Sequence, residues 1–194
     1  CLQSAKVELR DIDLIAVTMG PGLIGSLLVG VNAAKGISYG LDIPLIGVNH
    51  LEGHLLAIFL QEQIKFPFIS LVVSGGHTDL YRVDNFGSYK ILGRTRDDAA
   101  GESFDKVAKM LGHKYPGGPI IEKIAKEGNK DAHKFPRAYL EKDSLDFSFS
   151  GVKTSVKTFI NKKQKNNIPG LSDQDIAAGF QEAVVEVLSK KIIM

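Results

Sequence analysis

The sequence predicts an α/β protein in which a parallel βαβ unit is followed by an antiparallel meander. Two short β-branched, apolar segments, residues 14–18 and 44–48, flank a helical stretch rich in small residues, 23–39. A strand, a helix and a second strand in this order form a parallel pair with a right-handed crossover. Three further strand-like segments follow one another across short turns: residues 68–73, 77–83 and 88–92.

Composition is ordinary for a soluble globular protein, with 44% hydrophobic and 24% charged residues. A formal net charge of +2 is too small to predict a partner, so any basic surface must be a local patch. The single cysteine, Cys1, excludes an internal disulfide framework and suits a reducing compartment. No apolar run approaches the ~20 residues of a membrane span. We therefore expect a cytoplasmic protein without membrane contact.

Both ends of the 194-residue chain look cut. The chain opens without a methionine and already inside a helix-like pattern. It closes inside an amphipathic helix that no capping residue follows. We expect an internal fragment of a longer protein.

The first strand runs into the glycine-rich corner Gly20-Pro21-Gly22, which the helix of residues 23–39 follows. A strand, a glycine turn and a helix N-terminus together form a phosphate-binding corner, because the helix end carries a partial positive charge. An ordinary tight turn explains the same residues equally well.

His50 and His54 directly follow the second strand and are four residues apart. On a helix they share one face, where two imidazoles can hold one metal ion with a third ligand from elsewhere. Surface or packing histidines remain the alternative. A zinc protease of the HExxH type is disfavoured, because Leu51 stands where that motif needs a glutamate.

The hairpin around Ser74-Gly75-Gly76 is the most informative stretch of the chain. Glycines in a tight primed turn supply positive φ without strain and let an anion approach free backbone N–H groups. A plain hairpin would need only the glycines. Polar residues gather here as well, since His77-Thr78-Asp79 follow at once, and this favours a binding site.

A helix is predicted over residues 97–111, with Asp97 and Asp98 at its start and Asp105 toward solvent or a ligand hydroxyl. The proline-bracketed residues 115–119 predict a rigid turn that brings bare backbone close to a ligand or a neighbouring helix. Another helix is expected over residues 120–126.

The next segment concentrates positive charge in a helix, residues 152–160, and a polar loop, residues 161–167. Such a stretch contacts an RNA backbone or is an ordinary solvated surface. The lysines of this basic segment are Lys153, Lys157, Lys162, Lys163 and Lys165.

A Ser172–Asp175 capping box begins the last helix, which is predicted over residues 173–193.

Six motifs stand in the order and near-spacing of one known family: residues 20–30, 49–57, 71–80, 97–112, 115–119 and 146–154. The chain resembles the tRNA N6-adenosine threonylcarbamoyltransferases, formerly called O-sialoglycoprotein endopeptidases, in their bacterial type. The resemblance implies an actin/sugar-kinase/Hsp70-like fold with two ribonuclease-H-like lobes, here incomplete at both ends. Residues 1–66 would be the remainder of the N-terminal lobe without its first strands. Residues 67–194 would be the first part of the second lobe with a helical insertion.

The resemblance also implies a function. Such an enzyme transfers the threonylcarbamoyl group from threonylcarbamoyl-AMP to N6 of adenosine 37 in tRNAs that read codons beginning with A. It implies one divalent transition metal, iron or zinc, held by His50 and His54, and it assigns no residue as nucleophile or base. The implied substrate-binding residues are Val72, Val73, Ser74, Gly75, Gly76, Asp105, Gly118 and Glu122.

Implied partners are tRNA, a non-catalytic paralogue and a small ATPase. Further family site residues, including a late aspartate that completes the metal site, fall outside these 194 residues, so we expect the fragment alone to be inactive. Two other readings stay open at this point. One is another enzyme of the same fold, a carbamoyltransferase or a kinase, and the other is a non-catalytic paralogue that acts as a scaffold.

Overall fold

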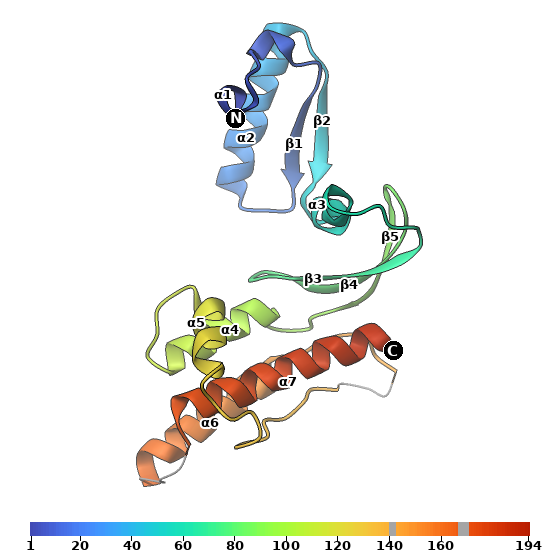
Figure 1. Cartoon of the computed structure of the whole chain (residues 1–194). Coiled ribbons are helices and arrows are strands. Elements are labelled where there is room, and N and C mark those ends of the chain that lie inside the picture. Colours follow the sequence, from blue (N-terminus) through green and yellow to red (C-terminus); the bar gives the residue numbers. More distant parts are fainter. Residues whose placement is uncertain (140–142, 167–170) are drawn as a thin grey trace. The chain divides into compact units, whose positions relative to one another are not determined.

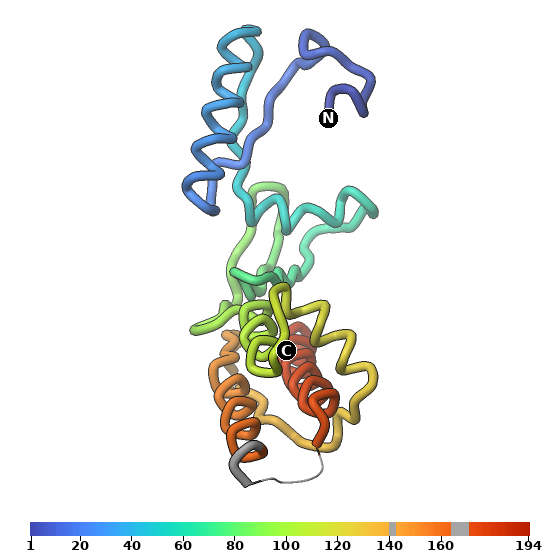
Figure 2. The backbone as a smooth tube through the Cα atoms, turned by 90° about the vertical axis from the view of Figure 1, so that its left-hand side faces the viewer, coloured from blue at the N-terminus to red at the C-terminus, as the bar shows by residue number. Residues whose placement is uncertain are grey.

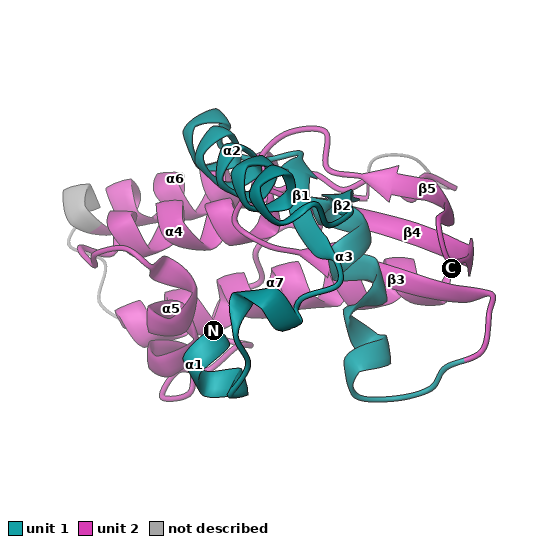
Figure 3. Ribbon diagram, turned by 90° about the horizontal axis from the view of Figure 1, so that it is seen from above, with its two compact units in different colours: residues 1–64 teal, residues 65–194 magenta. Residues whose placement is uncertain are grey.

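The computed structural model describes residues 1–139, 143–166 and 171–194, and the side chains of residues 164–166 are not described (Figure 1). The chain forms two compact units, Cys1–Ile64 and Lys65–Met194 (Figure 3). Each unit is treated by itself below. The identity of the predicted segments 1–66 and 67–194 as ribonuclease-H-like lobes stays a prediction.

Unit 1 contains the predicted βαβ arrangement. Strands β1 (Ile15–Gly20) and β2 (Leu45–Asn49) pair in parallel, with Ile15 opposite Leu45 and Gly20 opposite Asn49. Helix α2 (Ile24–Leu41) connects them and lies alongside the pair (Figure 1). The short helices of this unit are α1 (Leu2–Ala5), η1 (Leu9–Asp11), α3 (His50–Leu56) and η2 (Ala57–Leu60).

Unit 2 opens with the predicted meander. Strands β3 (Phe68–Val73), β4 (Thr78–Asn85) and β5 (Ser88–Arg94) form an antiparallel sheet in the order β3-β4-β5. All three predicted strands are confirmed, and β5 runs two residues further than expected, to Arg94.

Helices complete unit 2: α4 (Ala100–Met110), α5 (Gly117–Ala125), α6 (Ser150–Asn166) and α7 (Asp173–Ile193). Helix α4 packs against α5 and α6, and α7 packs against α5 and α6 (Figures 1 and 2). Phe180 of α7, Ile121 of α5 and Val107 of α4 are fully buried in one apolar core together with Phe147 and Phe149. Burying one such side chain contributes about 1.5–3 kcal/mol, so this core fixes how the helices of unit 2 pack.

The turn predicted at residues 115–119 is partly wrong, because α5 already begins at Gly117. Pro119 falls in the first turn of this helix, where the backbone N–H that proline lacks would have no intrahelical partner anyway. Pro119 is therefore compatible with a helix that starts directly after Pro116, at Gly117.

The loop predicted at residues 161–167 is also wrong as far as the structure describes it. Helix α6 continues through Asn166, and residue 167 lies outside the described residues. Lysine and glutamine are good helix formers, and the segment 161–166 holds no glycine or proline to stop the helix. Phe159 and Ile160 pack against the core just before it, which anchors the extension.

Within the described ranges, no helix combines the length and the apolar character needed to cross a membrane.

Candidate functional site

The turn between β3 and β4 is held by its own serine. The backbone N–H of Ser74 donates to the carbonyl of His77 at 2.8 Å. Ser74 Oγ accepts from the N–H of Gly76 at 3.2 Å and of His77 at 3.0 Å. Neither Gly75 nor Gly76 has positive φ, so the primed turn was a wrong prediction. A four-residue connection is commonly built on a type I turn, which needs no positive φ.

The expectation of free backbone donors is therefore only partly right. The N–H groups of Gly76 and His77 are used inside the turn, whereas Gly75 N–H has no acceptor in the described part of the chain. Two accepted hydrogen bonds occupy the lone pairs of Ser74 Oγ, so its O–H is left to donate outward. A Cβ placed on Gly75 or Gly76 would meet nothing within 4 Å. A ligand therefore has room to approach this turn.

Helix α4 begins against this turn. The N–H of Gly101 donates to the carbonyl of Ser74 at 3.1 Å, and the N–H of Ala100 donates to Thr78 Oγ1 at 2.8 Å. A Cβ on Gly101 would lie 2.6 Å from the Ser74 carbonyl oxygen, so only glycine fits there. Thr78 is fully buried. Its hydroxyl supplies the cap that Ala99, the N-cap residue of α4, cannot provide.

Asp105 lies one turn further along α4, on the same face as Gly101. Its Oδ1 accepts from the N–H of Gly117 at 2.7 Å, so this carboxylate caps helix α5. Gly117 is as tightly placed as Gly101, since its Cβ would lie 2.6 Å from the Asp105 Cα. The close backbone approach predicted for residues 115–119 is thus made with the neighbouring helix.

Gly118 and Glu122 follow on α5. A Cβ on Gly118 would meet nothing within 4 Å, in contrast to Gly117. Glu122 is exposed and pairs with Lys126 at 2.8 Å, and the hydrogen bond from Lys126 lowers the pKa of Glu122. Because Gly101 contacts the turn and Asp105 contacts Gly117, one face of α4 links the Ser74–His77 turn to the start of α5. The structure therefore brings the Ser74–His77 turn, Asp105 and the start of α5 together along this face.

Val72 and Val73 differ from the other predicted residues. Val72 is buried within β3, opposite Asp79, whereas Val73 is 44% exposed opposite Thr78. Side chains of successive strand residues point to opposite faces. Val73, at the end of β3 next to Ser74, is thus the one of the two with exposed apolar surface.

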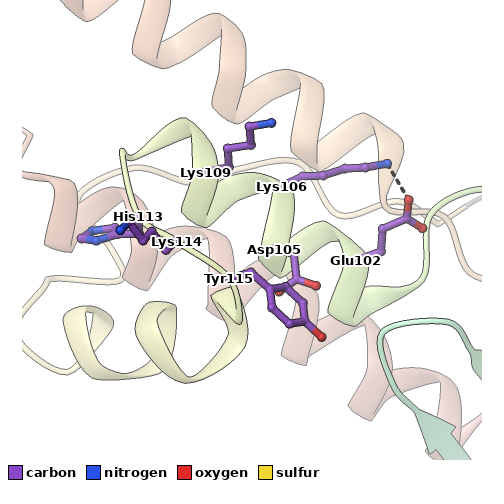
Figure 4. Close-up of a pocket in the computed structure, with 7 residues that line it drawn as sticks. All are labelled: Glu102, Asp105, Lys106, Lys109, His113, Lys114 and Tyr115. Atoms are coloured by element: carbon purple, nitrogen blue, oxygen red, sulfur yellow. Dashed lines mark ion pairs between the residues drawn. The ribbon is translucent and has the colours of Figure 1, made fainter.

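A hollow of about 410 Å³ lies along α4 (Figure 4). Lys106 in this hollow is paired twice, with Glu102 at 2.8 Å and with Asp98 at 2.7 Å. The hollow is lined by Glu102, Asp105, Lys106, Lys109, His113, Lys114 and Tyr115. Asp105 therefore belongs both to the α5 cap and to this hollow.

The histidine pair lies in unit 1, at the start of α3. Asn49 ends β2 and caps α3 by accepting from the N–H groups of Leu51 and Glu52 at 2.9 and 3.3 Å. The Nε2 atoms of His50 and His54 are 3.2 Å apart and both rings are exposed. Nitrogens about 2.0–2.1 Å from one shared metal are separated by about 2.9–3.4 Å for bond angles between 90° and tetrahedral. The pair therefore fits two ligands of one ion.

The same 3.2 Å also fits an N–H···N hydrogen bond between the rings, so a metal would compete with a proton for this position. In the ranges that the structure describes, no group of three or more His, Cys, Asp or Glu residues could hold a metal. The described residues therefore supply two ligands for one metal ion, His50 and His54.

His50 also lines a second hollow, of about 610 Å³, within unit 1. Its other walls come from β1 and the first turns of α2, including Thr18, Gly22 and Ser26. The Gly20-Pro21-Gly22 corner thus borders an open space next to the histidine pair, and its role in holding a phosphate stays a prediction.

Two aspartates have roles that the sequence did not indicate. Asp97 does not cap α4: its Oδ1 accepts from the N–H groups of Phe149 and Ser150 at 2.8 and 3.3 Å, so it caps α6. Asp98 instead binds Lys106 and Lys153. Burial by itself raises the pKa of Asp98, but the hydrogen bonds from these two lysines outweigh it and lower the pKa.

A third aspartate, Asp146, completes this cross-link. Its Oδ1 accepts from the N–H of Arg94 at 2.9 Å, and its Oδ2 pairs with the Arg96 side chain at 2.8 Å. Both contacts hold the pKa of Asp146 below its usual value, with the Arg94 N–H as the larger cause. We call the contacts of Asp97, Asp98 and Asp146 the aspartate clasp. It ties residues 94–98 to residues 146–153 and so joins the start of the motif 97–112 to the motif 146–154.

Two lysines of the basic segment 152–167 are already held in ion pairs, so fewer are available to a ligand than its composition indicates. Lys153 is bound to Asp98, and Lys163 pairs with Asp173 at 3.2 Å. The Lys165 side chain lies outside the described residues. Lys157 and Lys162 are exposed on α6.

Taken together, these features define an α/β protein with an open glycine turn against a helix N-terminus and a carboxylate-capped second helix, the kind of arrangement that binds a small anionic ligand. The comparison with known proteins makes this specific. A family model described as tRNA N6-adenosine threonylcarbamoyltransferase matches residues 1–194, and the chain belongs to this family. Membership confirms the predicted family and supports its actin/sugar-kinase/Hsp70-like fold class, and it disfavours the kinase and scaffold alternatives.

Curated relatives carry the same description. The chain is 57% identical to the one from Clostridioides difficile over 99% of this chain and 57% of the relative. It is 59% identical to the one from Thermodesulfovibrio yellowstonii over 98% of this chain and 58% of the relative. The chain thus spans less than two thirds of the length of these relatives. A solved structure of YeaZ from Pseudomonas aeruginosa aligns at 18% identity with a TM-score of 0.34 over 46% of each chain, too low a likeness to compare folds.

Proposed function

We propose that the full-length protein transfers the threonylcarbamoyl group from threonylcarbamoyl-AMP to N6 of adenosine 37 in tRNA. The observation that carries this proposal is the family match over residues 1–194, together with curated relatives that bear this name at 57% and 59% identity. The geometry of unit 2 agrees with it, because an open glycine turn and a second open glycine lie along one helix face.

In the proposed reaction the N6 amine of adenosine attacks the carbamoyl carbon, a C–N bond forms, the bond from that carbon to the phosphate oxygen breaks, and AMP leaves. The amine gives up one proton. Acyl transfer from a mixed anhydride has a good leaving group, so no covalent enzyme nucleophile is needed.

The residues of unit 2 would bind and orient the adenylate. The O–H of Ser74 and the N–H of Gly75 are donors for its phosphate, and Gly76 leaves room for it. Asp105 has one oxygen engaged with Gly117 and its other oxygen left to accept from a ribose hydroxyl. Gly118 would let the nucleoside approach the start of α5, with Glu122 one turn further on.

His50 and His54 would hold a divalent transition metal, iron or zinc. When bound, such an ion polarises substrate oxygens and neutralises negative charge. The turn at Asn49 sets both rings on one exposed face of α3, and their Nε2 separation of 3.2 Å suits two ligands.

We also propose the partners that the family implies, which are tRNA, a non-catalytic paralogue and a small ATPase. We further propose a cytoplasmic location.

The test uses the full-length protein with unmodified tRNA, threonylcarbamoyl-AMP and the partner proteins. Digested tRNA is then analysed by mass spectrometry for N6-threonylcarbamoyladenosine. We expect this nucleoside in the reaction with the wild-type protein and not in a reaction without it. Its absence in the presence of bound metal, adenylate and tRNA would overturn the proposed function.

A further inference from the structure

We propose that the hollow along α4 receives the RNA loop that carries the target adenosine, with Lys109 and Lys114 on backbone phosphates and Tyr115 stacked on an unpaired base. This inference rests on the proposed function, and it assigns a contact surface for tRNA to this chain.

Charge is separated along the hollow. Its two carboxylates, Glu102 and Asp105, lie on the first half of α4, and Lys109, His113 and Lys114 follow at the other end (Figure 4). Lys106 between them is neutralised by Asp98 and Glu102. Lys109 and Lys114 are exposed and have no ion pair with any residue that the structure describes. The end of the hollow near Lys114 is thus the end that attracts a phosphate.

Tyr115 supplies an aromatic surface in the same hollow, where its ring lies beside Asp105 (Figure 4). It is 83% exposed and lines the hollow. One exposed aromatic ring is ordinary for a protein surface. Together with the two unpaired lysines that line the same hollow, it gives the combination with which proteins bind single-stranded RNA, in which bases stack on aromatic rings and cations hold the backbone.

Position favours RNA as well. Asp105 lines the hollow and also caps Gly117, next to the open Gly118. An RNA strand in the hollow would therefore run beside the place proposed for the adenylate, where its adenosine must arrive. Helix α6 is less suited, because its Lys153 and Lys163 are already held by Asp98 and Asp173.

The experiment measures tRNA binding by the full-length protein between 50 and 300 mM salt for three variants. Lys109→Ser with Lys114→Ser removes both proposed phosphate contacts, and Tyr115→Ala removes the stacking surface. Lys65→Ser with Lys90→Ser is the matched control, because these lysines are exposed and carry the same charge. Lys65 precedes β3, and Lys90 lies opposite Arg82, so both are away from the Ser74–His77 end of the sheet. Threonylcarbamoyl-AMP binding is measured on the same samples.

Each single-strand phosphate contact adds about 0.7 to the log–log salt slope. We therefore expect the double lysine variant to bind tRNA at least about tenfold more weakly at low salt and to lose about 1.4 from the slope. Tyr115→Ala should weaken binding at all salt concentrations with the slope unchanged, by about five- to a hundredfold for one lost stack. Lys109→Arg with Lys114→Arg should retain the wild-type slope. Adenylate binding should be unchanged in all variants.

The inference is overturned if the double lysine variant and the control show the same tRNA affinity and slope. It is also overturned if adenylate binding is lost together with tRNA binding, since the lysines would then belong to the nucleotide site. A protein partner in place of RNA would show as unchanged tRNA binding with loss of that partner. Failure of the proposed function is a separate result, because the wild-type protein itself would then form no modified nucleoside.

Discussion

At the scale of single residues, Thr78 joins the turn to α4. Its hydroxyl is fully buried and accepts from the N–H of Ala100 at 2.8 Å. We expect Thr78→Val to lower the free energy of unfolding by about 1–3 kcal/mol, because it leaves a buried helix N–H without an acceptor. Thr78→Ser should keep most of the stability. Urea unfolding of both variants measures this, and equal stability of Thr78→Val and wild type would contradict the capping role.

The lowered pKa values of Asp98 and Asp146 predict how the stability of the protein depends on pH. Contacts with cations and a backbone N–H hold both pKa values below the ordinary 3.8. A carboxylate with a depressed folded-state pKa stabilises the protein above the unfolded pKa and loses this contribution as pH falls through the folded-state value. We therefore expect stability from these groups to be constant from pH 7 to about 5 and to fall below about pH 4. Unfolding midpoints at pH 7, 5, 4 and 3.5 measure it.

Asp146→Asn is the matched variant for that measurement, because it keeps the shape of the side chain and removes its titration. It should be less stable than wild type at pH 7 and should lose less stability on acidification. A fall as steep as that of the wild type would show that the acid sensitivity originates elsewhere.

At the scale of secondary structure, the aspartate clasp determines where α6 starts. Asp97 accepts from Phe149 N–H and Ser150 N–H and also from Ser148 Oγ at 2.5 Å. We expect Asp97→Ala to cost about 1–2 kcal/mol, the usual loss of a helix cap. Thr154→Ala, on an exposed position of the same helix, is the control and should cost less than half as much. Thermal unfolding of the two variants compares them.

Local pattern predicted most elements but not their long-range contacts. The strands of the meander were predictable, because alternating apolar residues between turns have a period that only a sheet satisfies. The role of Asp97 was not, because its partners lie about fifty residues further on and a cap is normally sought in the next turn of chain. The polar composition of residues 161–167 predicts a loop, although nothing in residues 161–166 stops a helix.

The candidate site was predictable to a similar degree. The glycine turn and the histidine pair could be found from residue type and spacing alone. Which glycines serve packing and which stay open could not, because Gly117 and Gly118 are neighbours in the sequence and differ only in what surrounds them. The position of Thr78 directly after the turn indicates a role in the site. The sequence does not indicate that its hydroxyl accepts from the N–H of Ala100.

At the scale of the whole molecule, the proposed metal ligands lie in unit 1, at His50 and His54. We expect His50→Ala with His54→Ala to remove bound metal from the full-length protein and to abolish transfer, while thermal stability changes little, because both rings are exposed. Metal analysis and mass spectrometry of tRNA nucleosides measure the two effects. Full metal occupancy in the double variant would refute the ligand assignment.

The central claim for unit 2 is that the adenylate lies at the Ser74–His77 turn and the open start of α5. Neighbouring glycines allow this to be tested apart from the fold. Gly118→Ala places a methyl group in open space and alanine is the better helix former, so stability should be unchanged or slightly raised. Gly117→Ala forces a clash with Asp105 and should destabilise the protein.

The decisive measurement is calorimetric titration of threonylcarbamoyl-AMP into the full-length protein with Gly118→Ala. A bound nucleotide leaves no room for the added methyl group, so we expect at least about tenfold weaker binding, a loss of about 1.4 kcal/mol, at an unchanged melting temperature. Wild-type affinity in this folded variant would place the adenylate elsewhere and contradict the proposed site.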